Sequence, residues 1–160
     1  MTALELTPVW DKTFPSERQG GARQDHLPQP LRHRAGGRRI QAEARAANGR
    51  FKAIAVSGPF GAVKEQASGL YAQTLAERGF LTIAFDPSFT GESGGSPRAV
   101  ASPDINTEDF SAAVDYLANR TDVDPEGIGI VGICGFGAWH STRPRTTRAS
   151  RPPWRAPCTT

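Results

Sequence analysis

The sequence predicts an α/β protein in which parallel strands are joined by crossover helices. Three short apolar runs typical of buried strands occur at residues 51–57 (FKAIAVS), 80–85 (FLTIAF) and 128–133 (IGIVGI). Two segments with helical periodicity lie between them. Because strand–helix–strand units close with parallel strands and right-handed crossovers, we expect one sheet with helices packed on it.

The first helix is predicted to end at Gly79, since glycine readily adopts the left-handed backbone that follows many helix C-termini. Its apolar face follows the spacing i, i+4, i+7, i+11 and i+12. The residues on this predicted face are Val63, Ala67, Leu70, Thr74 and Leu75.

The second helix is predicted to begin at Asn106 or Thr107, either of which can cap it. The acidic residues at 108 and 109 then fall in its first turn, where they favour the helix dipole. Its predicted core face consists of Phe110, Ala113, Val114 and Leu117.

Charge and composition divide the chain into three parts. Residues 51–137 contain five basic and 11 acidic residues, a net charge of −6, and all the periodic segments. Residues 1–50 and 138–160 are rich in arginine, proline and glycine without periodicity. We therefore expect a partial α/β core over 51–137, flanked by irregular N-terminal and C-terminal segments.

Length and cysteine content limit the class of protein. The 160 residues suit one domain, and no run of 18 apolar residues or secretory signal occurs. The two cysteines, Cys134 and Cys158, form neither a metal motif nor a disulfide framework. The sequence therefore predicts a reduced, cytoplasmic protein without a membrane span.

Unusual residues follow each of the three predicted strands, where chemistry gathers in parallel sheets. They are SGPFG at 57–61, Asp86 with the glycine-rich segment 91–95, and GICGFG at 132–137. We interpret Asp86 and Ser93 as ordering their loop. The third segment resembles a nucleophile elbow, in which a strained strand-to-helix turn exposes one side chain, here Cys134. A helix N-terminus there would favour the thiolate, whereas the simpler alternative is a buried structural cysteine.

Three segments together, SGPFGAVKEQ, FDPSFTGESGG and GIGIVGICGFG, resemble the N-terminal half of an α/β-hydrolase of the dienelactone-hydrolase-like branch. The resemblance implies that Cys134 is the nucleophile and that the Gly135 amide is one oxyanion donor. The second donor would come from the loop after the first strand, and Phe60 is the candidate because Pro59 has no N–H. The implied activity is hydrolysis of an ester, lactone or similar acyl bond in a small molecule, with no cofactor and no metal.

The chain departs from the family pattern at and after the elbow. Phe136 stands where the second elbow glycine is expected, and Gly137 follows it. In this family the acid and the histidine of the triad follow the nucleophile. The 23 residues after Gly137 contain no acidic residue and one histidine, His140, while His26 and His33 lie upstream. We therefore expect the 160-residue chain to be inactive.

The arginine-rich ends have two interpretations. The first is a nucleic-acid-binding module in which arginines neutralise phosphates. The absence of lysine from 16–50 and 138–160 argues against it. The second is that the reading frame of the gene is shifted near residues 16–19, restored near 44–50 and shifted again near 137–138. Synonymous codons can be chosen for both ends so that, read in another frame, they encode sequence with the periodicity of strands and helices. A well-packed strand pair within 19–45 would argue against this second interpretation.

Overall fold

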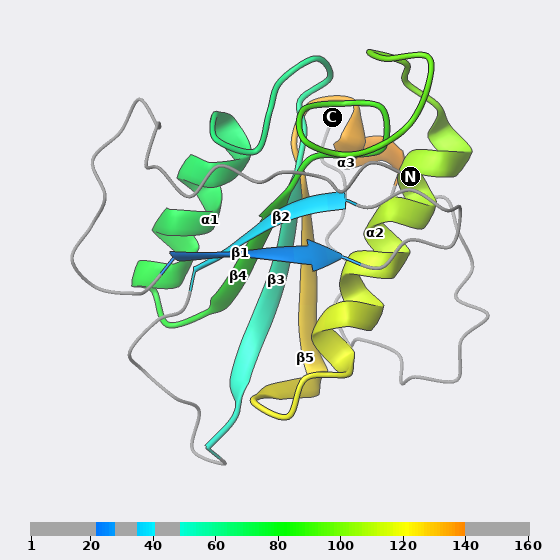
Figure 1. Cartoon of the computed structure of the whole chain (residues 1–160). Coiled ribbons are helices and arrows are strands. Elements are labelled where there is room, and N and C mark those ends of the chain that lie inside the picture. Colours follow the sequence, from blue (N-terminus) through cyan, green and yellow to red (C-terminus); the bar gives the residue numbers. More distant parts are fainter. Residues whose placement is uncertain (1–21, 28–34, 41–48, 140–160) are drawn as a thin grey trace.

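The structure is a computed structural model that describes residues 22–27, 35–40 and 49–139 (Figure 1). The described strands form one sheet in the order β1-β2-β4-β3-β5. These strands are β1 (Ala22–Leu27), β2 (Ala35–Ile40), β3 (Phe51–Ser57), β4 (Leu81–Phe85) and β5 (Val123–Gly132). The helices are α1 (Ala67–Glu77), α2 (Pro103–Ala118) and the single turn α3 (Phe136–Trp139).

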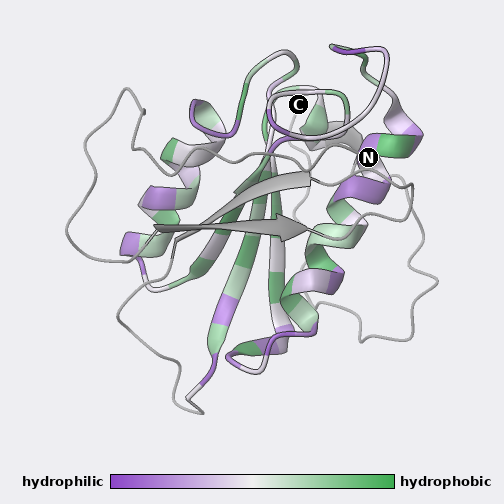
Figure 2. Ribbon diagram, viewed as in Figure 1, coloured by the Kyte–Doolittle hydropathy of each residue, from purple (hydrophilic) through white to green (hydrophobic). Residues whose placement is uncertain are grey.

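The predicted parallel core is confirmed. β3 pairs in parallel with β4 on one side and with β5 on the other, so it lies at the centre of the parallel part of the sheet. α1 and α2 lie on opposite sides of these strands (Figure 1). Because both faces of the strands are covered, they are apolar along most of their length (Figure 2). The carboxyl ends of β3, β4 and β5 consequently meet at one edge of the sheet.

Two hydrophobic clusters, one on each face, hold the helices to the sheet. The cluster toward α2 is built from large side chains, among them Phe51, Phe85, Phe110 and Leu117. The cluster toward α1 has a buried centre of smaller side chains from β3, β4 and α1, against which Ile54, Leu75, Val131 and Ile133 pack. Its buried members are Val56, Ala72, Ala76 and Ala84.

The buried face of α1 differs from the predicted one. The helix begins at Ala67 rather than Val63, and Leu70 is 47% exposed. The buried residues are instead Ser68, Gly69, Ala72, Gln73 and Ala76. Of the predicted face, Leu75 is partly buried and packs against the cluster toward α1, whereas the fully buried contacts of α1 are made by smaller or polar residues. The Thr82 hydroxyl of β4 donates a hydrogen bond to the Ala72 carbonyl at 2.9 Å. The predicted end at Gly79 is confirmed by its φ of +97°.

α2 begins earlier than predicted, at Pro103, with Ser102 in the N-cap position. Proline suits the first turn of a helix because its missing N–H would have no partner there. Asn106 is therefore inside the helix, and its side-chain oxygen accepts the Ser102 backbone N–H at 3.1 Å. The predicted core face is otherwise correct, since Phe110, Ala113 and Leu117 are buried; Val114 is half-buried.

Residues 22–27 and 35–40 are strands rather than the irregular chain that composition suggested. β1 and β2 pair antiparallel, and β2 pairs antiparallel with β4. The prediction was wrong here because backbone groups along the edge of β4 can pair with a strand whose side chains do not alternate. The structure describes this strand pair by its backbone pairing and not by its side-chain packing, so it does not meet the condition of a well-packed pair. The shifted frame stays a prediction for this segment and for residues 138–160, and the native codons test it.

Replacing Phe110 with alanine is expected to lower the free energy of unfolding by about 3–5 kcal/mol. The Phe110 ring is 2% exposed and meets the Phe85 ring edge-on, with ring centroids 5.1 Å apart. Leu70→Ala is the matched control on the other helix, and its effect should stay within about 0.5 kcal/mol. Denaturant unfolding of both variants measures the difference. Equal losses in the two variants would contradict the described core.

Candidate active site

Cys134 occupies a strained turn at the carboxyl end of β5. Its φ of +60° lies in the left-handed region, which costs a non-glycine residue about 1–2 kcal/mol. The preceding Ile133 N–H donates to the Ser57 carbonyl at 3.0 Å, and the Gly137 N–H donates to the Cys134 carbonyl at 2.9 Å. The thiol is exposed, so the interpretation as a buried structural cysteine is wrong. A strand, a strained residue and a helical turn therefore follow one another as in a nucleophile elbow.

Close packing requires a glycine at position 132, because a Cβ there would lie 2.5 Å from the Phe136 carbonyl oxygen. A Cβ at Gly135 would lie 2.0 Å from Cε2 of Phe60, so a side chain there would displace the Phe60 ring. The Phe136 side chain is 1% exposed and belongs to the core cluster toward α2. Phe136, which stands where the family has its second glycine, thus fixes the turn to the hydrophobic core.

Phe60 lies beside this turn, on the loop that joins β3 to α1. Its ring is 41% exposed, and its centroid is 4.7 Å from that of Phe136. The same ring lies against Gly135. The structure therefore brings together Cys134, Gly135 and Phe60, the three residues that the resemblance implies for the site.

A cavity of about 320 Å³ adjoins the turn, between the loops that follow β3 and β4. Phe60 and Phe136 belong to both the cavity wall and the surroundings of Cys134. Most of the lining is apolar, and Arg98 and Asn106 add polar atoms. The main apolar lining residues are Phe60, Val63, Pro87, Phe89, Val100 and Phe136.

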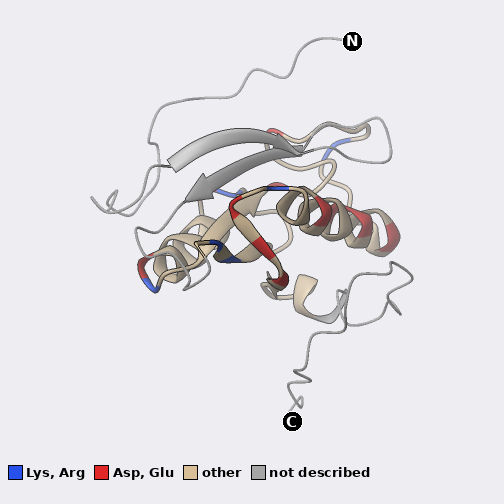
Figure 3. Cartoon of the chain, turned by 90° about the horizontal axis from the view of Figure 1, so that it is seen from below, with Lys and Arg blue, Asp and Glu red and all other residues tan. Residues whose placement is uncertain are grey.

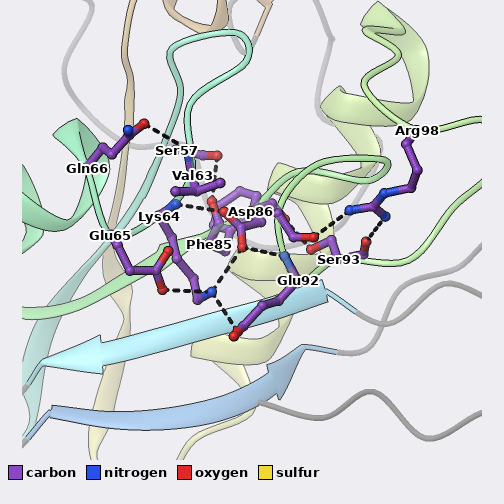
Figure 4. A network of polar contacts seen from close by, with 11 residues as sticks. Ser57, Val63, Lys64, Glu65, Gln66, Phe85, Asp86, Glu92, Ser93 and Arg98 are labelled. Atoms are coloured by element: carbon purple, nitrogen blue, oxygen red, sulfur yellow. Dashed lines mark hydrogen bonds and ion pairs between the residues drawn. The ribbon is translucent and has the colours of Figure 1, made fainter. Parts of the chain in front are cut away.

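Lys64 and Asp86 form a buried ion pair that joins the two loops (Figure 4). The Lys64 Nζ lies 3.0 Å from Oδ2 of Asp86, 2.7 Å from Oε2 of Glu92 and 2.9 Å from Oε1 of Glu65. The side chains of Lys64 and Asp86 are 1% and 0% exposed, whereas those of Glu65 and Glu92 are 15% and 25% exposed. One ammonium is therefore surrounded by three carboxylates.

The carboxylate of Asp86 also orders the backbone of both loops. Its Oδ1 accepts the Lys64 backbone N–H at 2.7 Å, and its Oδ2 accepts the Glu92 backbone N–H at 3.0 Å. The Ser93 hydroxyl donates to the Asp86 carbonyl at 2.6 Å. The interpretation of Asp86 and Ser93 as residues that order a loop is confirmed.

Burial and charge act in opposite directions on the titration of Lys64. Desolvation lowers the pKa of Lys64, but attraction to Asp86 and hydrogen bonds to Glu65, Glu92 and Asp86 outweigh it, so the pKa is raised above its ordinary value. The ammonium is therefore charged throughout the physiological pH range. A raised pKa is expected for a buried cation that is paired with carboxylates, whereas burial alone would lower it.

A second buried carboxylate, Asp109 of α2, holds the start of the loop after β4. Its two oxygens accept the Ser88 backbone N–H and the Ser88 hydroxyl, both at 2.8 Å. The Asn106 side chain donates to the same carboxylate at 3.1 Å. The loop is thus fixed to α2 as well as to the loop that carries Phe60.

Sequence reasoning missed Lys64 because its partners are 22 and 28 positions away. A signal existed, since Asp86 directly follows a strand that is buried throughout, and a carboxylate there needs a cation or several donors. The histidines that we considered as partners for Cys134 are not part of this site as described. His33 and His140 lie outside the described residues, and only the backbone of His26 is described.

Residues 49–139 contain 11 acidic and six basic residues, and acidic residues recur along α2 (Figure 3). The arginines of residues 138–160 lie outside the described part of the chain. Within the described part, no three His, Cys, Asp or Glu side chains form a group that could hold a metal ion. None of the described helices has the length and apolar character needed to cross a bilayer.

Comparison with curated proteins finds relatives along much of the chain. The uncharacterized protein PA2218 of Pseudomonas aeruginosa is 56% identical over 137 residues, 84% of this chain and 36% of PA2218. The uncharacterized protein YcjY of Escherichia coli is 55% identical over 84 residues, 52% of this chain and 28% of YcjY. Thiohydrolase aneE of Aspergillus aculeatus is 37% identical over 86 residues, 54% of this chain and 27% of aneE. No family model matches the chain.

Solved structures share the fold. The crystal structure of PA2218 has a TM-score of 0.81 at 53% identity and matches 87% of this chain and 43% of that one. The α/β-hydrolase GrgF of Penicillium has a TM-score of 0.65 at 21% identity, over 73% of this chain and 39% of GrgF. The dienelactone-hydrolase-like phosphotriesterase P91, from metagenomic libraries, has a TM-score of 0.58 at 22% identity, over 76% of this chain and 52% of P91.

These comparisons confirm the predicted resemblance. The chain has the N-terminal half of the α/β-hydrolase fold, and it spans about a third of the length of the curated relatives it matches. A dienelactone-hydrolase-like enzyme is among the proteins that share the fold. The match to PA2218 covers 84% of the chain, so it extends beyond residues 51–137 into at least one of the arginine-rich ends.

Replacing Gly91 with alanine is expected to destabilise the fold far more than replacing Gly61. A Cβ at Gly91 would lie 2.4 Å from the Asp86 carboxylate, whereas nothing lies within 4 Å of one at Gly61. Both positions have positive φ, +54° and +74°, so the backbone strain of about 1–2 kcal/mol is shared. The excess comes from disturbing a buried ion pair and should bring the loss for Gly91→Ala to about 3 kcal/mol or more.

Denaturant unfolding of the two alanine variants measures this difference directly. Equal destabilisation by Gly91→Ala and Gly61→Ala would show that the carboxylate of Asp86 is not packed against the loop as described.

Proposed function

We propose that this chain supplies the nucleophile half of a hydrolase that cleaves an ester, lactone or similar acyl bond in a small molecule. Cys134 is the nucleophile, and the backbone amides of Gly135 and Phe60 stabilise the oxyanion. The observation that carries the proposal is the exposed thiol held at φ +60° at the carboxyl end of β5. Non-glycine residues keep such strained backbone mainly at functional positions.

The proposed chemistry begins with attack of the Cys134 thiolate on the substrate's carbonyl carbon. A carbon–sulfur bond forms, and the π electrons of the carbonyl move to its oxygen. The two backbone amides then stabilise this negative oxygen. Collapse of the intermediate breaks the bond to the leaving group, which departs and takes a proton from water. A thioester to Cys134 remains until water hydrolyses it.

The substrate class is proposed from the cavity and from the relatives together. The apolar lining of the cavity beside Phe60 and Phe136 suits the hydrocarbon part of an acyl compound. Among the relatives, aneE is named a thiohydrolase, and drtE of Aspergillus calidoustus, 27% identical over 94 residues, is named an acyltransferase. The name of drtE describes transfer of an acyl group and that of aneE describes a hydrolysis, and the chemistry proposed for Cys134 combines both.

The proposal predicts that Cys134 reacts selectively with acyl donors. Oxyanion donors assist acyl transfer but not alkylation, which develops no oxyanion. For the 160-residue chain, the ratio of the acylation rate with 4-nitrophenyl acetate to the alkylation rate with iodoacetamide should be at least about 10-fold higher at Cys134 than at Cys158. Mass spectrometry of peptides measures both rates at both thiols. The same ratio at the two thiols would refute the proposed oxyanion site.

The same chain is expected to show no measurable esterase turnover. The triad's histidine and acid, which assist deacylation, do not follow Cys134 in the family order. Acylation should therefore give at most one product molecule per acylated side chain, followed by a rate equal to the uncatalysed reaction. A burst assay with 4-nitrophenyl acetate measures this. Sustained turnover that is lost in both Cys134→Ala and His140→Ala would overturn the expectation.

A further inference from the structure

The loop that carries Phe60 is fixed at two points, one on each side of the proposed donor. At its start, the Ser68 hydroxyl donates to the Gly58 carbonyl, which ties the loop to α1. At its end, Lys64 is tied to Asp86 through both its backbone N–H and its ammonium. Between these points the backbone makes one turn, closed by the Ala62 N–H on the Pro59 carbonyl at 3.2 Å. The direction of the Phe60 amide is therefore set by the two anchors.

The second anchor is a network of four charged side chains. The ammonium of Lys64 is held by carboxylates from three positions, namely its neighbour Glu65, the strand end Asp86 and the following loop at Glu92 (Figure 4). The Glu92 backbone N–H returns to Asp86, so the two loops share one closed network. Any rotation of the backbone at Lys64 would break contacts in both loops at once.

We propose that Lys64, together with Asp86, is a positioning residue for the oxyanion site, because it fixes the loop that presents the Phe60 amide to a carbonyl bound at Cys134. This inference rests on the proposed function. It adds a role for a buried charge that touches neither the substrate nor the thiol. Loss of the ammonium removes one of the two links between the end of the loop and Asp86, so the second oxyanion donor is less firmly preorganised while Cys134 itself keeps its turn.

The test compares Lys64→Met with Lys64→Arg in a Cys158→Ala background of the full 160-residue chain. Both variants keep the backbone N–H that Asp86 accepts, and only the arginine keeps the positive charge. The rates of Cys134 acylation by 4-nitrophenyl acetate and of alkylation by iodoacetamide are measured on folded protein, identified by circular dichroism. We expect Lys64→Met to lower the acylation rate about 10-fold and to change alkylation less than about 2-fold. Lys64→Arg should recover most of the acylation rate.

Arg120→Met is the matched control, because it removes another ion pair, that of Arg120 with Asp122 at 2.7 Å, far from the loops in sequence. It should leave the ratio of acylation to alkylation unchanged. Glu92→Gln serves if Lys64→Met fails to fold, since it removes a 25%-exposed carboxylate and leaves the contacts between Lys64 and Asp86. Glu92→Gln should lower the ratio of acylation to alkylation at Cys134 about 3-fold, a smaller effect than the loss of an entire oxyanion donor.

Two results would overturn the inference while leaving the proposed function intact. The first is a ratio of acylation to alkylation at Cys134 that is the same in folded Lys64→Met as in the Cys158→Ala chain. If Lys64→Met does not fold, the same result in Glu92→Gln counts instead. The second is an equal fall of the ratio in Arg120→Met. Failure of the proposed function has a different signature, because in the chain with both cysteines the ratio of acylation to alkylation would then be the same at Cys134 and Cys158.

Discussion

The arrangement of the loops at the carboxyl ends of β3 and β4 depends on the contact between Lys64 and Asp86. Asp86 ends a buried strand, so its carboxylate must be satisfied inside the protein. The nearby loops supply one ammonium and two backbone N–H groups to it. Satisfying a single buried charge therefore determines the paths of both loops that line the cavity. The charged network stabilises a particular arrangement more than it stabilises folding as such.

Local sequence patterns predicted the strands and helices whose conformation is set by neighbouring residues along the chain. The parallel strands, the end of α1 at Gly79 and the buried face of α2 with Phe110 follow from periodicity and from one glycine. The buried face of α1 could not be predicted by the same method, because small residues such as Ala72 pack by shape rather than by hydrophobicity. β1 and β2 were missed because β1 pairs with β2, and β2 with β4, through backbone groups that every sequence possesses.

The candidate site was predictable in part for a related reason. Cys134 and Gly135 belong to one short motif, and Phe60 follows from the missing N–H of its neighbour Pro59. Lys64 lies within the segment SGPFGAVKEQ, but nothing local to this segment indicates its partner, a carboxylate 22 positions later in the chain. A polar residue placed directly after a wholly buried strand is the general sign that such a distant partner exists.

The two proposed oxyanion donors have anchors of different physical kinds. Gly135 belongs to the turn that Phe136 fixes in the hydrophobic core, where its ring centroid is 6.0 Å from that of Phe110. The Phe60 loop is instead fixed by charges, two of which belong to partly exposed carboxylates. Hydrophobic packing resists salt and pH, whereas partly exposed ion pairs respond to both. The strained backbone of Cys134 is thus held by hydrophobic packing, which is insensitive to salt and pH. The loop that carries Phe60 is held by ion pairs, which salt and pH can weaken.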